Sequence, residues 1–270
     1  MRFNRRMSIG LLLLGGLALA AIMAPFLVGD PFAISPANRL RPPSALYPFG
    51  TDNFGRSVLS RTVYGGRISL IVGGAVAAIS VVLGFAIGLP AGYFRRIDNV
   101  VMRVMDGIMA IPSVLLAIAV VTLTGSGVGT VIAALAVPEV PRVVRLVRSL
   151  VLMIRELPFV EAAVASGSSS FKVLWLHVLP HTVAPVIVQV TYVAGSTILT
   201  EAALSFLGIG TPATIPTWGN MIANARNFFS LAPWLIIFPG IAVSIAVLAV
   251  NLFGDGLRDL LDPRLARRVR

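Results

Sequence analysis

The chain of 270 residues contains no cysteine, a single lysine and few charges of either sign. The absence of cysteine excludes disulfides and thiolate metal sites. A nucleotide-binding loop of the Walker A type needs a glycine directly before its lysine, whereas Lys172 follows a phenylalanine. Gly-x-Ser-x-Gly and His-Glu-x-x-His motifs are absent as well. We therefore expect no catalytic residues, no bound metal and no cofactor bound by this chain.

The scarcity of charge indicates a membrane protein. Charged residues make up 12% of the chain, against about 25% in soluble domains, while 57% of residues are hydrophobic and the mean hydropathy is +0.90. A spanning helix needs about 20 mostly apolar residues. Five runs without Asp, Glu, Lys or Arg reach that length: 9–28, 68–94, 107–138, 173–200 and 227–254. Their continuous apolarity excludes the alternating pattern of barrel strands, so the predicted class is an all-α membrane protein.

Six transmembrane helices are predicted because one run is too long for a single crossing. The run 107–138 contains the turn-forming stretch 122–130, rich in Gly, Ser and Thr, near its middle. The predicted spans are 9–28, 68–94, 104–123, 128–148, 183–206 and 231–254. Together they make residues 1–270 a single transmembrane domain, with a long loop at 29–66 and a second long loop at 149–182.

The basic residues predict the orientation. With a cytoplasmic N-terminus, 16 of the 22 Lys and Arg residues fall in internal segments, in blocks at 2–6, 95–103, 142–172 and 258–270. The positive-inside rule favours this arrangement, which makes both termini and loop 149–182 cytoplasmic and loop 29–66 external. The net charge of +11 therefore reflects membrane orientation, and we expect the lipid bilayer, and no nucleic acid, as a partner.

The first residues resemble a secretory signal, with a basic head, an apolar middle and small residues at Ala18 and Ala20. The apolar run 9–28 is longer than a usual signal core of roughly 7–15 residues. We therefore expect the segment to be kept as the first span.

Outside the spans, two short helices are expected at the external surface. The stretch 54–67 reads as an amphipathic helix with its arginines in the headgroups, and Trp218–Phe229 reads as a helix dipping in at the outer mouth. Within the second span, Gly84 and Gly88 lie four residues apart, a spacing that lets helix backbones approach closely in lipid.

Glu201 and Trp218 are the notable side chains near the external end. A carboxylate inside a span is costly and is a functional candidate by default, but close to a helix end it can simply reach the interface. We hold both interpretations of Glu201 open. Trp218 fits an interfacial aromatic belt.

Loop 149–182 reads as a folded module. Pro158 suits the first turn of a helix, Ala162 and Ala163 favour its continuation, and Gly167 permits a sharp turn. A second short helix over 171–179 is expected to follow.

This second helix is expected to be capped by Ser168 or Ser170 and to stop before Pro180. His177 and His181 are four residues apart, but a proline between them interrupts the helix. We interpret them as an ordinary polar pair and not as a metal site.

A short helix with a small alanine face and one carboxylate, Glu161, is suited to dock into a groove of another protein. A chain that moves solute uphill without a nucleotide site of its own needs such a contact, because coupling requires differential contacts in two states. The alternative is an ordinary connecting loop.

The residues of this loop resemble the EAA loop of bacterial ABC importer permeases. The matching positions are Glu161, Ala162, Ala163, Gly167, Leu179 and Pro180. Five further stretches resemble the second permease subunit of dipeptide, oligopeptide and nickel importers: PFGTDNFGRSVLSRTVYGGRISL, RIDNVVMRVMDGIMAIP, ILTEAALSFLGIG, PTWGNMI and GDGLRDLLDPR. The resemblance covers nearly the whole chain, in order.

The resemblance implies a type I ABC importer permease fold in the bacterial cytoplasmic (inner) membrane. It implies a homologous second permease subunit, two ABC ATPase subunits that hold ATP and Mg, and an extracytoplasmic solute-binding protein. The ATPase would dock on the EAA-loop residues, with Arg155 and Lys172 flanking the docking surface. Possible contacts with the pathway or with the binding protein are Glu201, Trp218, Asn220 and Arg226. The chain departs from the family at Val164, Ser166, Ser168 and Ser170, which implies a dedicated ATPase partner.

Di- or oligopeptides are the expected solute, with nickel or nickel chelates, glutathione and opines as alternatives. A rival class is a proton-coupled secondary transporter that uses Glu201 or Glu139, and a third is a scaffold without transport. Neither rival explains the docking module.

Overall fold

The computed structural model describes residues 5–261, and over this range the chain is helical, with one isolated bridge between Thr51 and Ser57 as its only strand-like pairing. The predicted all-α class is confirmed. The helices are α1 (Arg5–Ile22), α2 (Ala24–Leu27), α3 (Val58–Tyr93), α4 (Arg95–Met109), α5 (Ser113–Thr124), α6 (Val128–Ile154), α7 (Pro158–Ala165), α8 (Ser170–Val173), α9 (Leu179–Phe206), α10 (Trp218–Ala225) and α11 (Trp234–Leu261).

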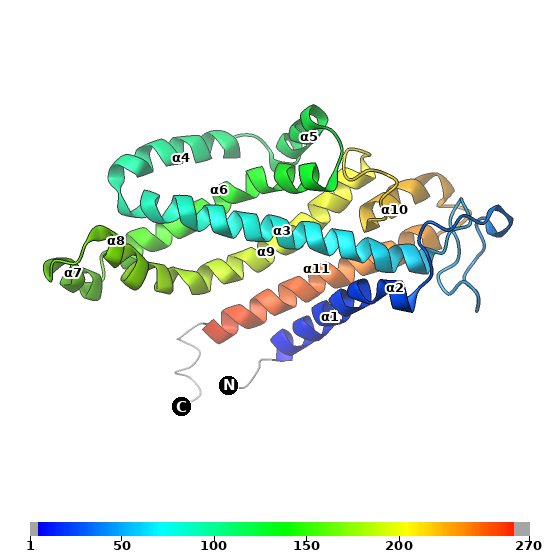
Figure 1. Ribbon diagram of the computed structural model, residues 1–270, viewed down its shortest axis with the longest axis horizontal. Helices are drawn as coiled ribbons and strands as arrows, with labels where there is room; N and C mark the ends of the chain where they lie inside the picture. The colour runs from blue at the N-terminus through cyan, green and yellow to red at the C-terminus, as the bar shows by residue number, and fades with distance from the viewer. Residues whose placement is uncertain (1–4, 262–270) are drawn as a thin grey trace.

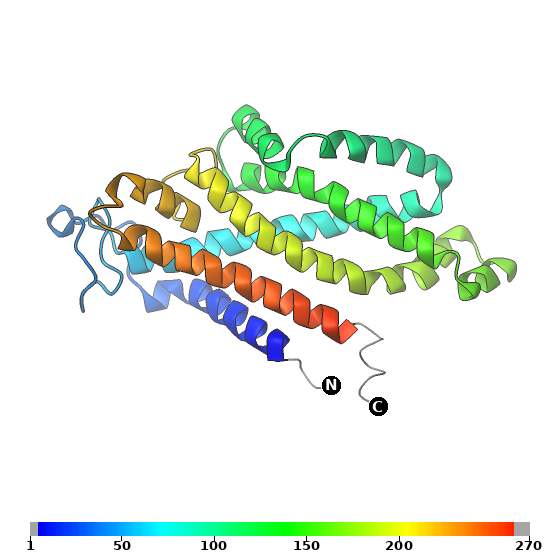
Figure 2. The same ribbon diagram turned by 180° about the vertical axis from the view of Figure 1, so that it is seen from behind.

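Long helices lie side by side and form the body of the molecule (Figure 1). Helix α3 packs along α6, α1 along α11, and α9 between α3 and α11. The start of α1 and the end of α11 are directed toward the same end of the molecule as α7 (Figures 1 and 2). We call this the EAA-loop end. The opposite end holds the segment 29–57 and α10.

Within residues 5–261, four continuous helical stretches are long and apolar enough to cross a membrane: α1, α3, α11, and the stretch from α8 through α9. The pair α4 and α5 adds a fifth if it counts as one span, but the two helices meet at an angle of 86°. The predicted span 104–123 is therefore not one straight helix. The sharp break falls beside Pro112, where a kink is expected because proline cannot continue the backbone hydrogen bonding.

Helix α6 has 27 residues and carries four charges, two of which bind α4. The guanidinium of Arg145 donates to Asp106 and that of Arg148 to Asp98. These ion pairs hold α4 against α6. The span count of six stays a prediction.

Helix α3 packs closely against α6 along a row of glycines. A Cβ atom added at Gly88 would lie 2.8 Å from Cβ of Val147, and one added at Gly92 would lie 2.6 Å from Cβ of Val151. Such distances leave room only for glycine. The glycine ridge of α3, continued by Gly84, thus receives a valine ridge of α6, and the predicted packing role of these glycines is confirmed.

The expectation of a separate surface helix over 54–67 is wrong. Helix α3 begins at Val58, with the Ser57 hydroxyl accepting from the Ser60 amide as its N-cap, and runs unbroken to Tyr93. Arg61 lies inside this helix with 2% of its surface exposed, and so it does not reach the headgroups. Within 218–229, by contrast, the expected short helix is present as α10, followed by a 3₁₀ turn at Arg226–Phe228.

The expectation that a helix stops before Pro180 is also wrong. A π-helical turn at Leu174–Val178 joins α8 to α9, and Pro180 occupies the first turn of α9. Proline has no N–H to donate, and the π-helical turn before it already changes the backbone hydrogen bonding, so the proline fits without ending the helix. The result is one continuous helical stretch from Ser170 to Phe206.

Candidate functional site

The EAA loop protrudes from one end of the molecule as the helices α7 and α8 (Figure 1). Pro158 is in the first turn of α7, as predicted. Gly167 has φ +80°, and the amides of Gly167 and Ser168 donate to Val164 O at 2.9 Å and Ala163 O at 3.1 Å. This is a Schellman ending, which needs a left-handed residue after the helix. A Cβ at Gly167 would meet no atom within 4 Å, so the backbone conformation, and not space, favours glycine here.

The cap of α8 is Ser169, and neither Ser168 nor Ser170 as expected. The Ser169 hydroxyl accepts from the Lys172 amide at 3.4 Å. The prediction was off by one residue because each of three consecutive serines is a suitable cap.

Helix α7 fully buries one side chain and leaves most of the others exposed. Val160 is 2% exposed and belongs to the main core cluster. Val164 is 51% exposed, and Phe171 and Trp175 nearby are 71% and 50% exposed. Glu161 and Ala162 are exposed and Ala163 is half-buried. Apolar side chains grouped on a protruding element mark an interaction surface.

Arg155 and the pair Leu179 and Pro180 lie at the base of the loop. The Arg155 guanidinium donates to Gly92 O at 3.3 Å, at the end of α3, and to Glu156 Oε1 at 3.1 Å. Leu179 packs against the core, while Pro180 is exposed. Lys172 is exposed beside α7. The structure thus assembles Glu161, Ala162, Lys172 and the exposed aromatic residues on the protruding part, with Arg155 fixing its base.

Glu201 lies in the interior near the opposite end. It has 0% exposure, and its carboxylate accepts from Ser205 Oγ at 2.8 Å, from Ser69 Oγ at 3.4 Å and from Thr211 Oγ1 at 3.5 Å. These donors come from α9, α3 and the segment after α9. Of the two interpretations left open, reaching the interface does not apply, because the carboxylate does not reach the surface of this chain.

Trp218 and Asn220 continue this buried network. Trp218 is 1% exposed and its Nε1 donates to Thr62 O at 2.9 Å, so its indole is not part of an exposed belt. Asn220 Nδ2 donates to Thr211 Oγ1 at 2.9 Å and to Pro212 O at 3.0 Å. Both side chains tie α10 to α3 and to the segment before it.

Arg226 remains on the surface and is the exposed member of the four outer candidates. Its guanidinium lies 5.9 Å from the centroid of the Phe206 ring, at the end of α9. Contacts of the four outer residues with a pathway or a binding protein stay predictions.

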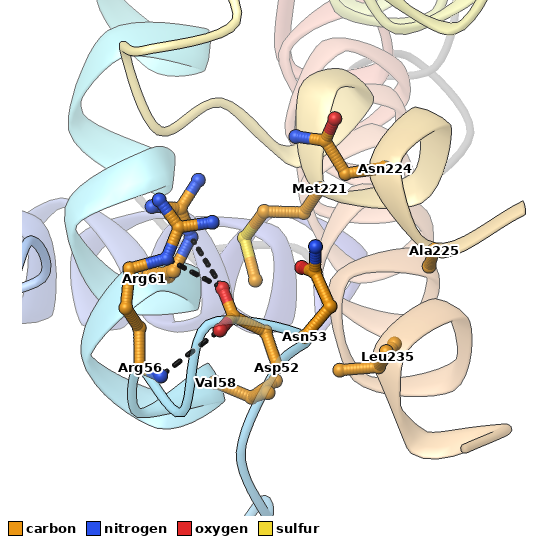
Figure 3. Close-up of a pocket in the computed structure, with 9 residues that line it drawn as sticks. All are labelled: Asp52, Asn53, Arg56, Val58, Arg61, Met221, Asn224, Ala225 and Leu235. Atoms are coloured by element: carbon orange, nitrogen blue, oxygen red, sulfur yellow. Dashed lines mark hydrogen bonds and ion pairs between the residues drawn. The ribbon is translucent and has the colours of Figure 1, made fainter. Parts of the chain in front are cut away.

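A second polar cluster holds Arg56, just before α3, and Arg61, inside α3 (Figure 3). Asp52 accepts from Arg56 Nε at 2.6 Å and lies 3.8 Å from Arg61 Nε. The carboxylate also accepts from the backbone amides of Phe54 and Arg56 at 2.8 and 2.9 Å. These bonds fold 51–57 into a turn at the start of α3. A small pocket beside the turn is lined by Asp52, Arg56 and Arg61 together with Met221 and Leu235.

Two cavities lie among α6, α9 and α11, and the sequence alone did not reveal them. The smaller, of about 320 Å³, includes Glu139, Arg142, Ser196 and Asn251 in its lining, and the larger, of about 720 Å³, includes His181 and Arg258. Gln189 and Tyr192 line both cavities. The sequence signal that could have revealed these cavities is the recurrence of polar residues, such as Gln189, Tyr192 and Ser196, on one face of the apolar helix α9.

The described residues contain no group of three or more His, Asp or Glu side chains that could hold a metal ion. His181 Nδ1 lies 2.8 Å from His177 O, and its ring lies 5.0 Å from that of Phe159. These contacts hold the start of α9 against α7.

The sequence matches the family described as binding-protein-dependent transport system inner membrane component over residues 62–267. A probable peptide ABC transporter permease protein of Sinorhizobium fredii is 55% identical over 263 residues, which cover 96% of this chain and 90% of the relative. The dipeptide transport system permease protein DppC of Alkalihalophilus pseudofirmus is 44% identical over 97% of this chain and 87% of the relative.

The glutathione transport system permease protein GsiD of Pectobacterium atrosepticum is 41% identical over 83% of this chain and 74% of the relative. Among solved structures, an inward-facing conformation of the MetNI methionine ABC transporter matches with a TM-score of 0.51 and 18% identity. The match covers 75% of this chain and 94% of that chain, and it confirms the expected permease fold.

Proposed function

The chain belongs to the family of binding-protein-dependent transport system inner membrane components and is a permease subunit of an ABC importer, and from this premise we propose that it imports di- or oligopeptides. The family supplies the class of partners: ATPase subunits, a second permease and a solute-binding protein. Neither rival class, a proton-coupled secondary transporter or a scaffold, accounts for the fact that this chain belongs to the family.

The protruding EAA loop is the observation that carries the proposed mechanism. We propose that Glu161, Ala162, Ala163 and Gly167 form the contact with an ATPase subunit, with Lys172 at its edge. The exposed side chains of Val164, Phe171 and Trp175 support this assignment, because burying them in a partner groove is favourable at about 25 cal/mol per Å² of apolar surface.

Force applied to α7 would pass into the bundle through two links. Val160 inserts α7 into the main core, and α8 runs without interruption into α9. A displacement of the EAA loop by the ATPase would therefore move α9 as a lever. ATP and Mg are proposed to reside in the partner ATPase subunits, where hydrolysis takes place.

The orientation proposed for this chain puts the EAA loop and both termini in the cytoplasm. The basic blocks of the sequence support it, as does the common direction of the start of α1, the end of α11 and α7. A homologous permease, two ATPase subunits and an extracytoplasmic solute-binding protein complete the proposed complex in the bacterial inner membrane.

Peptide is the first candidate solute because the relatives of highest identity named above are peptide or dipeptide permeases. Glutathione is the second candidate, favoured by the 41% identical glutathione permease. Uptake of labelled dipeptide and of labelled glutathione by the complex reconstituted in vesicles with its binding protein distinguishes the two.

Replacing Gly167 by valine tests the coupling assignment. A β-branched residue cannot adopt φ +80° without strain, so the exit from α7 must change. We expect Gly167→Val to abolish ATP-dependent uptake and the stimulation of ATPase activity by the loaded binding protein, while the subunit still inserts in the membrane.

Gly74→Val is the matched control, since Gly74 is an exposed helical glycine with no atom within 4 Å of its added Cβ. It should retain uptake. Full uptake by the Gly167 variant would show that the EAA loop does not couple ATP hydrolysis to uptake. Uptake by this chain alone, independent of ATP, would support the secondary transporter instead.

A further inference from the structure

One face of α9 is hollowed along almost the whole thickness of a bilayer. The residues of α9 that line the two cavities include, at helical spacing, His181, Pro185, Val188, Gln189, Tyr192, Ser196 and Leu199. At about 1.5 Å per residue this stripe is roughly 27 Å long, against a hydrocarbon core of about 30 Å. Gln189 and Tyr192 belong to both linings, so the cavities adjoin and widen toward the EAA-loop end.

Polar groups line this stripe at the middle depth of three helices. Glu139 lies 11 positions into the 27 residues of α6, or roughly 16 Å from its start. Asn251 lies at comparable depth in α11, and Gln189 lies at comparable depth in α9. Charges and amides at that depth are too costly to face lipid, so this face meets water, solute or protein. Figure 2 shows α9 between α6 and α11.

The charges of the smaller cavity are arranged so that the guanidinium, and not the carboxylate, is available. Arg142 Nη1 donates to Glu139 Oε1 at 2.8 Å. The Glu139 side chain is 10% exposed and that of Arg142 is 44% exposed. Of the five N–H donors of a guanidinium, one is used in this pair and the others remain for a ligand.

The larger cavity continues the same electrostatic character. Arg258 and His181 line it. The hydroxyl of Tyr192 donates to Asp255 Oδ1 at 2.6 Å, so the Asp255 carboxylate already accepts a hydrogen bond within the chain. Among the described residues, Glu139 is the only carboxylate in either lining, and it is paired. The cavity surface therefore favours an anionic group, and both volumes fall in the usual range for small-molecule sites.

We infer that the α9 face from His181 to Leu199 lines the solute path in this subunit, and that Arg142, positioned by Glu139, receives a carboxylate of the passing solute. The inference rests on the proposed function, because a path implies transport. The amides of Gln189 and Asn251 are placed to accept and donate hydrogen bonds to peptide groups of the same solute. Arg142 is thus a specificity-determining residue for solutes with a free carboxylate.

The path is tested with cysteine substitutions, for which this cysteine-free chain needs no prior changes. In the purified complex, a water-soluble maleimide should label Ser196→Cys and leave Ile187→Cys unlabelled. Ile187 is an exposed residue of α9 that lines neither cavity. Labelling of position 196 in the isolated subunit but not in the complex would show that the second permease covers this face, and would overturn the path.

The carboxylate is tested by protection, measured without the binding protein because that protein makes its own selection. A dipeptide should slow the labelling of Ser196→Cys at a concentration at least about tenfold lower than the same dipeptide with a C-terminal carboxamide. Adding Arg142→Gln should remove that difference, and Arg142→Lys should restore part of it. Equal protection by both compounds, or none, overturns the role of Arg142.

Uptake separates this inference from the proposed function. Arg142→Gln should lower dipeptide uptake about tenfold with the ATPase subunits still bound. Arg103→Gln, which removes the same charge from an exposed position of α4 outside both linings, should not. A wild-type complex that imports no peptide would count against the proposed function. A peptide-importing complex that is indifferent to Arg142→Gln would count against the inference alone.

Discussion

The two ends of the molecule are built in opposite ways. At the opposite end from the EAA loop, buried polar side chains form two hydrogen-bonded clusters: Glu201 and Asn220 share Thr211, and Asp52 binds Arg56. At the EAA-loop end, α7 is anchored by Val160, and apolar side chains such as Phe171 face outward. Buried hydrogen bonds fix a shape without help, whereas exposed apolar surface gains stability only when something covers it. The buried polar groups of the first end are therefore satisfied within this chain, whereas the apolar side chains of the EAA-loop end are suited to contact a partner.

Removing the Glu201 carboxylate should give the largest loss of stability. Glu201→Ala leaves the hydroxyls of Ser69, Ser205 and Thr211 without their common acceptor and opens a cavity. We expect a loss of about 3 kcal/mol in the free energy of unfolding, measured as a lowered midpoint of unfolding in detergent.

A second glutamate, at the EAA-loop end, provides the control. The side chain of Glu156 is 69% exposed and pairs with the neighbouring Arg155, so Glu156→Ala should change stability by less than about 0.5 kcal/mol. Glu201→Gln, which keeps the shape and an acceptor oxygen, should lie between the two. Equal midpoints for the alanine variants would remove the contrast between the ends.

Two glycines with the same backbone conformation sharpen the comparison. Gly55 has φ +75° and Gly167 has φ +80°. A Cβ at Gly55 would lie 2.6 Å from the Ser35 carbonyl carbon, whereas one at Gly167 would meet nothing within 4 Å. We expect Gly167→Ala to cost about 1 kcal/mol, the strain of a left-handed residue. Gly55→Ala should cost about 1 kcal/mol more than that because of the clash.

Chemical denaturation of the two variants side by side measures this difference. If Gly167→Ala proved as destabilising as Gly55→Ala, the EAA loop would be packed more tightly than its open surroundings indicate.

The sequence predicted what depends on apolarity and turn chemistry, and failed where polar groups compensate one another. The uncharged runs predicted the long helices, Pro158 predicted the start of α7, and Gly167 predicted its end. Arg61 misled the prediction of where α3 begins, because Asp52, nine positions earlier, lies beside its guanidinium and allows it to be buried. No local pattern reveals such a pairing.

The prediction that a helix stops before Pro180 failed for a similar reason, and the same reason left two interpretations of Glu201 open. The π-helical turn at Leu174–Val178 accommodates the proline, and three hydroxyls from separate segments accommodate the carboxylate. Both solutions depend on residues that only the fold brings together. The lining of the two cavities was missed because Gln189, Ser196 and Asn251 each look like a tolerated polar residue until the three helices are in contact.

Val160 is expected to control the stability of the EAA loop without affecting the bundle. Val160→Ala removes the one buried side chain of α7 and should lower the free energy of its local opening by about 2 kcal/mol. Amide hydrogen exchange within 158–165 should then be roughly thirtyfold faster, with the global midpoint of unfolding unchanged. Val164→Ala, at a position 51% exposed, should leave exchange as it is. A lower global midpoint for Val160→Ala would mean that α7 unfolds together with the bundle.

The smallest effect on stability is expected at the side chain with the largest effect on partner binding. Phe171 is 71% exposed, so Phe171→Ser should change the free energy of unfolding by less than about 0.5 kcal/mol. If the ATPase covers this surface, the same change should weaken its binding at least about tenfold, as for a buried aromatic at an interface, in a pull-down titrated with purified ATPase. Phe229→Ser is the matched control, since Phe229 is 58% exposed at the opposite end and should leave ATPase binding unchanged. Equal binding by both variants would mean that exposed apolar surface does not distinguish the EAA-loop end as a docking site. The difference between the two ends would then rest on the buried hydrogen bonds alone.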